Sequence, residues 1–150
     1  EVAELADAMP DLTIVLNHVG SPILGGPDRG LSDEVFTDWR ERIRRVGARE
    51  NVYIKLGVLP IGMSDFPGDR SLPPGSEEIA AAWRPWIETC IEAFGPARAM
   101  YESNFPVQKR WCSYQVSWNA FKRISQEATA TEKADLFAGA AARAYRIDGL

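Results

Sequence analysis

Four side chains with the chemistry of a catalytic site stand near the ends of three short apolar segments: a histidine, a lysine, a glutamate and an asparagine. An imidazole can bind a metal or transfer a proton, and a carboxylate can act as a general base. An ammonium group can stabilise developing negative charge, and an amide can hold water. The four residues are His18, Lys55, Glu102 and Asn104.

A purely structural role is the alternative for each of them. His18 could order the turn that follows it, and Lys55 and Glu102 could form a structural ion pair, although such pairs offset their desolvation poorly. Asn104 could hold its own turn through the side-chain amide. Two further cations, Lys109 and Arg110, are either solvated loop charges or a clamp for a substrate carboxylate.

The elements that must position these residues are three strands that alternate with helices. The apolar segments 12–16, 51–57 and the run that begins at Ala99 are of strand length, and amphipathic segments separate them. This alternation predicts an α/β fold with a parallel sheet. Because the carboxyl ends of parallel strands meet at one edge, the four side chains are expected to converge there.

Side-chain alternation along the strands predicts which residues share a face. Val52, Ile54 and Leu56 would lie under helices, which places Lys55 on the opposite side of the sheet. By the same rule Glu102 and Asn104 would share one face. The Gly- and Pro-rich stretch 58–75 is long for a loop and predicts an ordered lid. Ser76 is expected to be the N-cap of the helix that follows this stretch, and Thr131 the N-cap of the last helix.

The composition is that of an ordinary globular domain of 150 residues with a net charge of −4. There is no basic stripe for nucleic acid and no apolar run of the ~20 residues that a membrane span needs. The two cysteines have no metal-site spacing, so a reduced, cytoplasmic protein is expected. A single histidine excludes a multi-histidine metal site within this chain. The first residue is Glu1 rather than Met, which suggests a fragment.

Segments 16–22, 51–57 and 101–106 together resemble the C-terminal half of amidohydrolase-related proteins, in particular the TIM-barrel hydrolases that include lactonases. Segments 74–85 and 139–146 resemble the helix between the last two strands and the final helix of that family. The resemblance keeps this order over nearly the whole chain. It implies the C-terminal portion of a (β/α)8 TIM barrel, with about three parallel strands and flanking helices in one partial domain, residues 1–150.

The resemblance implies a hydrolase that uses water to open a lactone, ester or amide bond of a small polar substrate. It also implies either one divalent metal, zinc or manganese, or none. Family members usually carry a His-x-His pair on the first strand, and that pair is absent here. The isolated chain is therefore expected to be inactive. The alternative is a catalytically inactive barrel fragment that acts only by association, as a homo-oligomer formed through its exposed barrel edge.

Individual roles follow from the matched positions. His18 matches a family histidine that binds metal or contacts substrate. Asn104 stands at the position of an acid that activates water, and an amide cannot take up a proton near neutral pH. Glu102 is the possible substitute, and Asn104 would then position the water. The residues expected to bind substrate are Lys55, Lys109 and Arg110.

Overall fold

The computed structural model describes residues 1–21, 33–57, 73–110 and 112–149. Within these ranges, seven α- and π-helical segments and three strands form the scaffold, with short 3₁₀ turns between them. In chain order the elements are α1 (Val2–Ala8), β1 (Ile14–Leu16), η1 (His18–Gly20), α2 (Asp33–Gly47), β2 (Val52–Leu56), α4 (Ser76–Phe94), η2 (Pro96–Arg98), β3 (Ala99–Tyr101), η3 (Val107–Arg110), α5 (Tyr114–Ile124), α6 (Ala130–Ala134), η4 (Asp135–Gly139) and α7 (Ala140–Tyr145).

The described strands form one parallel sheet in the order β1–β2–β3. Leu16 is aligned with Ile54, and Leu56 is aligned with Tyr101. The α/β class and the parallel sheet predicted from the sequence are thereby confirmed. Each crossover between strands contains a helix, α2 in the first and α4 in the second.

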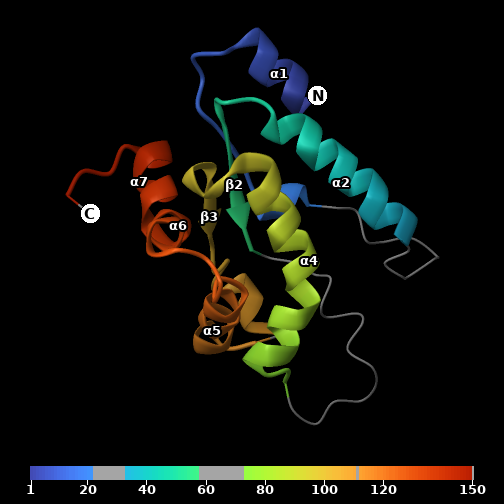
Figure 1. Cartoon of the computed structure of the whole chain (residues 1–150), viewed down its shortest axis with the longest axis vertical. Helices are drawn as coiled ribbons and strands as arrows, with labels where there is room; N and C mark the ends of the chain where they lie inside the picture. The colour runs from blue at the N-terminus through green and yellow to red at the C-terminus, as the bar shows by residue number, and fades with distance from the viewer. Residues whose placement is uncertain (22–32, 58–72, 111, 150) are drawn as a thin grey trace.

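The two faces of β2 differ as the alternation predicts. Val52, Ile54 and Leu56 are fully buried, whereas Tyr53 and Lys55 are only partly buried. Figure 1 shows α4 crossing in front of the strands with α2 beside it. The apolar face of the sheet therefore carries the helices, and Lys55 lies on the opposite face.

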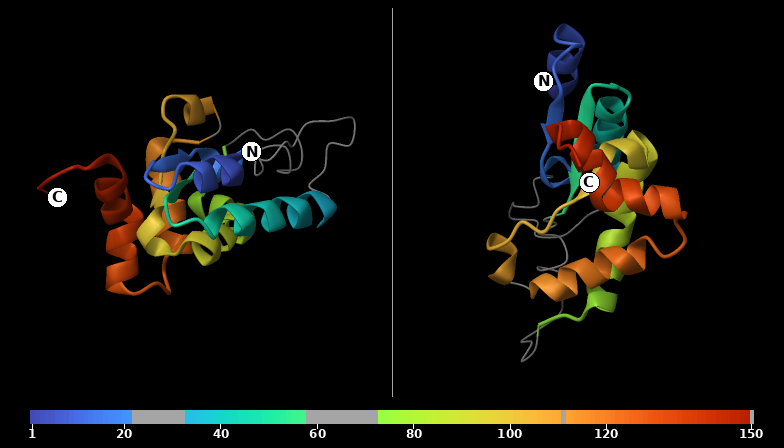
Figure 2. Two further views of the ribbon diagram at one scale, coloured as in Figure 1. Left: turned by 90° about the horizontal axis from the view of Figure 1, so that it is seen from above. Right: turned by 90° about the vertical axis from the view of Figure 1, so that its left-hand side faces the viewer.

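Aromatic side chains join the helices over this covered face. The ring of Trp86 on α4 lies 4.8 Å from Phe36 and 4.5 Å from Trp39, both on α2. On the other side of α4, Trp83 lies 5.5 Å from Phe121 on α5. Figure 2 shows α2 and α7 at opposite ends of this layer, with α4 between them. The helices thus fix the sheet from one side.

Several boundaries differ from those expected. Strand β1 begins at Ile14 rather than at residue 12, and β3 ends at Tyr101. The N-cap of α4 is Gly75 rather than Ser76. The N-cap of α6 is Thr129 rather than the expected residue 131, because Thr129 and Glu132 form a reciprocal capping box. The stretch predicted to be a lid lies outside the described residues, except for 73–75.

Among the described segments, no helix is both long enough and apolar enough to cross a membrane.

Candidate active site

The centre of the site is a contact between the first and the last strand ends. The Nδ1 atom of His18 lies 2.5 Å from Oε1 of Glu102, and the backbone N–H of His18 donates to the same oxygen at 3.2 Å. The two residues are 84 positions apart in the sequence. The side chain of Glu102 is 15% exposed and that of His18 is 32% exposed. The pair is therefore held inside the fold while the imidazole still reaches the surface.

Lys55 completes the charged group from the middle strand. Its Nζ lies 3.9 Å from Oε2 of Glu102, the oxygen that His18 does not contact. The same Nζ lies 5.7 Å from the ring centroid of Tyr145, at the end of α7. The carboxylate of Glu102 thus stands between an imidazole and an ammonium group, and an aromatic ring borders the ammonium group on another side.

A left-handed turn places His18 against Glu102. Residues 18 to 21 have φ values of +54°, +47°, +77° and +46°. Only the third of them is glycine, and a left-handed conformation costs other residues roughly 1–2 kcal/mol each. Val19 is β-branched and completely buried, and its carbonyl accepts a hydrogen bond from Nε1 of Trp39 at 2.9 Å. Burial and this bond hold the strained backbone, as is common where backbone strain serves a site.

Gly57 allows the last strand to come close to the middle one. A Cβ atom at this position would lie 2.3 Å from the carbonyl oxygen of Glu102 and 2.5 Å from its Cγ. The backbone N–H of Glu102 donates to the carbonyl of Leu56 at 3.3 Å, so the strands stay paired up to this point. Any larger residue at 57 would push Glu102 away from its present place.

Two other predicted site residues, Asn104 and Lys109, make no contact with this cluster among the described residues, and the side chain of a third, Arg110, is not described. The alternation that placed Asn104 beside Glu102 does not continue, because β3 ends at Tyr101 and Asn104 has a φ of +48°. Among the described residues its side chain makes no hydrogen bond, and the local turn bond comes from Ser103, whose Oγ accepts from the N–H of residue 105 at 3.4 Å. Lys109 is exposed in η3, and the side chain of Arg110 lies outside what the structure describes. Their proposed roles stay predictions.

The metal expected at His18 would need more ligands than the described residues bring together. Structural and catalytic zinc sites use three or four protein ligands. No group of three or more His, Cys, Asp or Glu side chains within the described ranges is placed to hold an ion. Among the described residues, Nε2 of His18 has no partner, and Glu102 already contacts His18 and Lys55. These residues do not make a metal site by themselves.

Three residues that position the site were not identified from the sequence. They are Trp39, Gly57 and Tyr145. A glycine directly after a strand is a signal of close backbone approach, so Gly57 could have been found. Trp39 and Tyr145 look like ordinary residues of apolar helix faces, and only the tertiary contacts distinguish them.

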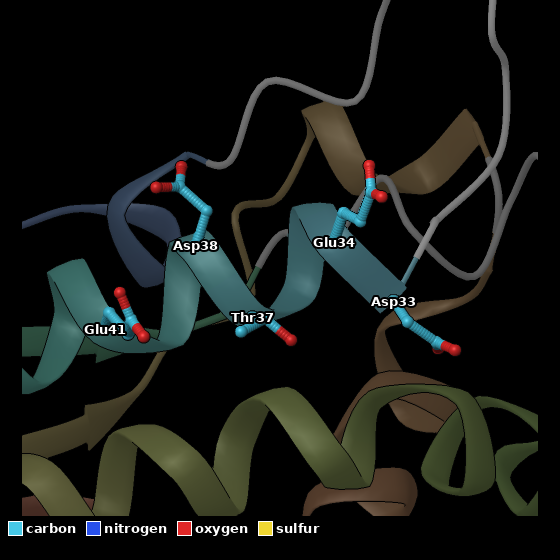
Figure 3. Close-up of a pocket in the computed structure, with 5 residues that line it drawn as sticks. All are labelled: Asp33, Glu34, Thr37, Asp38 and Glu41. Atoms are coloured by element: carbon cyan, nitrogen blue, oxygen red, sulfur yellow. The ribbon is translucent and has the colours of Figure 1, made fainter.

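A hollow on the surface lies apart from this cluster, on the solvent side of α2. Figure 3 shows its lining side chains spread along one helix. Four of them are carboxylates, Asp33, Glu34, Asp38 and Glu41, and the fifth is the hydroxyl side chain of Thr37. Asp38 already pairs with Arg42 at 2.8 Å. A single solvated helix face lacks groups that converge from several elements, so the hollow is not the candidate site.

Comparisons of the sequence with known proteins find a matching family and similar proteins. The family described as amidohydrolase matches residues 1–147. An uncharacterized protein of Sinorhizobium fredii is 37% identical over 147 residues, which cover 98% of this chain and 43% of that protein. An L-fucono-1,5-lactonase of Burkholderia multivorans is 31% identical over 135 residues, covering 89% of this chain and 43% of the lactonase.

Solved structures give the same picture of the fold. The crystal structure of an amidohydrolase from Burkholderia multivorans with bound HEPES superposes with a TM-score of 0.78 at 26% identity, covering 97% of this chain and 48% of that one. A second crystal structure of an amidohydrolase from Burkholderia multivorans, with bound zinc, superposes with a TM-score of 0.76. The chain spans less than half the length of these relatives. The prediction that its strands and helices are part of a TIM barrel is confirmed.

Proposed function

Because this chain belongs to the amidohydrolase family, we propose that the protein containing it is a hydrolase that opens the lactone ring of a small sugar acid with water. The observation that carries the proposal is the cluster of His18, Glu102 and Lys55 at the carboxyl edge of a parallel sheet. This edge is where TIM-barrel enzymes place their chemistry. The likeness to an L-fucono-1,5-lactonase supports the substrate class. Lactone opening is one case of the wider expectation, which is hydrolysis of a lactone, ester or amide bond.

The roles follow from the charges of the side chains. The partly exposed imidazole of His18 faces the substrate and the attacking water. Lys55 supplies positive charge for the oxyanion that forms when water adds to the lactone carbonyl. Asn104 positions water through its amide. Lys109 and Arg110 hold the hydroxyl groups of the lactone and the carboxylate that forms when the ring opens. The two cysteines are free and buried, which supports a reducing, cytoplasmic setting.

The test is an assay of the natural gene product against aldonolactones with five- and six-membered rings, including L-fucono-1,5-lactone. Release of acid is followed with a pH indicator. His18→Ala should lower kcat by about 10²–10⁴-fold while the circular dichroism spectrum stays that of the wild type. Lys55→Met should also lower kcat. The matched control is Lys122→Met, because Lys122 is an exposed lysine on α5. Unfolding of His18→Ala would instead support a turn-ordering role.

The same assay decides the cofactor requirement, since the two expectations are one zinc or manganese ion, or none. Activity is measured after dialysis against a chelator and again after each metal is added back. Asn104→Asp is included, because a carboxylate adds a metal ligand and a base at that position. If neither metal content nor activity changes in Asn104→Asp, residue 104 has only a structural role.

A second candidate function is association without catalysis. Within the described sheet β1 and β3 each pair on one side only, and Leu5, Met9 and Leu12 are exposed near the first strand. Unpaired strand edges favour pairing with another chain. We propose on this basis that the isolated 150-residue chain forms homo-oligomers. Light scattering coupled to gel filtration should give a mass above that of the monomer, and a stable monomer would contradict this candidate.

A further inference from the structure

The imidazole of His18 is held in one orientation by two bonds to a single carboxylate oxygen. Both its ring Nδ1 and its backbone N–H face Oε1 of Glu102. In a neutral imidazole, a bond from Nδ1 to a carboxylate requires the proton to be on Nδ1. The lone pair is then on Nε2, the nitrogen that points away from Glu102.

We propose that His18 is the general base of the hydrolysis, through Nε2, and that Glu102 is a positioning residue that fixes the tautomer and orientation of His18. This inference rests on the proposed lactone hydrolysis and gives the acid–base chemistry of the same site. It differs from the expectation that Glu102 itself replaces an acid at position 104.

The contacts of Glu102 argue against direct proton abstraction by this carboxylate. Oε1 accepts from the backbone N–H of His18 and contacts its Nδ1, and Oε2 faces the ammonium group of Lys55 at 3.9 Å. Its side chain is also the more buried of the pair, at 15% exposure against 32% for His18. Water therefore reaches the imidazole more easily than it reaches the carboxylate.

The neighbouring polar group does not offer a base either. Asn104 carries an amide, which does not take up a proton near neutral pH. His18 is the only histidine in the chain. The fold also maintains its position at a cost, since His18 begins the left-handed turn and Trp39 holds that turn from α2. Backbone strain that is kept in place by burial and a side-chain bond is typical of functional positions.

The proton transfers balance without any further reactant. As the water oxygen attacks the lactone carbonyl carbon, one water proton moves to Nε2 of His18, and Lys55 faces the resulting oxyanion. The ring C–O bond then breaks, and Nε2–H returns the proton to the leaving oxygen, which becomes the new hydroxyl group. Glu102 stays ionised throughout and stabilises the imidazolium that exists between the two steps. The product is the open hydroxy acid.

The test uses the natural gene product labelled with ¹⁵N at histidine, and compares wild type, Glu102→Gln and Glu92→Gln. Glu92 lies on the exposed side of α4 with an ion pair to Arg44 at 3.7 Å, so it is the matched control. Long-range ¹H–¹⁵N spectra should show protonated Nδ1 and unprotonated Nε2 in wild type and in Glu92→Gln. Glu102→Gln should lose this tautomer preference.

Kinetics separate a positioning role from a structural one. We expect Glu102→Gln to lower kcat by about 10²–10⁴-fold with little change in KM, as when an orienting carboxylate is replaced by an amide. Unchanged kcat in Glu102→Gln would overturn the inference while leaving lactone hydrolysis intact. The inference would also be overturned if activity were lost on chelation and restored by zinc, and if zinc shifted the ¹⁵N signal of His18 Nε2.

The failure of the proposed function is recognisable by a different result. If the wild-type protein opens no lactone, ester or amide, then the hydrolase proposal is wrong and the general-base inference falls with it, even if the predicted tautomer is observed. Should Glu102→Gln unfold, Trp39→Phe provides the second variant, because it removes the bond to the turn and keeps an aromatic ring against Trp86. It should lower kcat by less, about 10-fold, and broaden the His18 signals; wild-type kcat and signals in Trp39→Phe would count against the inference.

Discussion

One added methyl group at Gly57 tests whether the close approach of β2 and β3 builds the site. In Gly57→Ala, the new Cβ would lie 2.3 Å from the carbonyl oxygen of Glu102, whereas ordinary contact begins at 3.4 Å. The end of β3 must therefore move by about 1 Å relative to β2. That movement separates the Glu102 N–H from the carbonyl of Leu56, whose bond is already 3.3 Å long.

The expected cost is the sum of overpacking and the lost bond. Overpacking in a tight site costs about 1–3 kcal/mol, and one backbone hydrogen bond contributes about 1 kcal/mol. Gly57→Ala should therefore lower the free energy of unfolding by about 2–4 kcal/mol. Because Glu102 moves with its backbone, its contact with His18 should lengthen. A displacement of this size near the chemistry costs about 10²-fold in rate.

Urea unfolding followed by circular dichroism measures the first effect, and lactone hydrolysis measures the second. Gly47→Ala is the matched control, because its Cβ would lie 2.6 Å from the carbonyl oxygen of Ala93, where α2 packs on α4. It should lose comparable stability and keep its rate below the unfolding transition. Wild-type stability in Gly57→Ala would refute the close approach. Equal rates in the two variants would refute the link between this approach and the chemistry.

Three further predictions concern residues outside the central pair. Burial raises the pKa of Tyr101 from 10.0 to about 12, so the fold favours the neutral phenol. This preference stabilises the fold by about 2–3 kcal/mol below pH 10, and the stabilisation should be lost between pH 10 and 12. The loss should be absent in Tyr101→Phe. Arg98 donates to three backbone carbonyls at 2.7–2.9 Å, so Arg98→Met should lower the unfolding free energy by about 2–3 kcal/mol in urea melts. Tyr145→Leu removes the ring beside Lys55 and should raise KM about 2- to 5-fold, whereas Tyr145→Phe should not.

Each of these has a clear contrary result. An alkaline transition that persists unchanged in Tyr101→Phe would assign it to another group. An Arg98→Met protein as stable as the exposed control Arg42→Met would show that the three carbonyls find other partners. Equal KM values for Tyr145→Leu and Tyr145→Phe would show that the aromatic ring beside Lys55 does not contribute to substrate binding.

Sequence patterns were sufficient for the sheet and its faces. Val52, Ile54 and Leu56 are buried where alternation predicts, because the strand period of two is a local property. Helix starts were predicted less well. Thr129 and Glu132 have the spacing of a capping box, and that spacing was a better guide than the presence of a threonine at 131.

The site was only partly predictable. His18, Lys55 and Glu102 meet because parallel strand ends share an edge, which follows from topology. The position of Asn104 does not follow, since its left-handed backbone ends the alternation. The turn at Val19 is even less predictable, because a β-branched residue disfavours that conformation and only tertiary burial and Trp39 impose it.

The left-handed turn after β1 also constrains how this site can be altered by evolution or design. Four consecutive residues, 18–21, have positive φ, and each one occupies a set place relative to the end of the strand. Substitutions at 18 or 21 change a side chain and keep the path of the backbone. An insertion or deletion between Asn17 and Ser21 shifts Val19 out of its buried position and turns residue 18 away from Glu102. New reactivity at this edge is therefore reached through exchange of side chains at constant loop length.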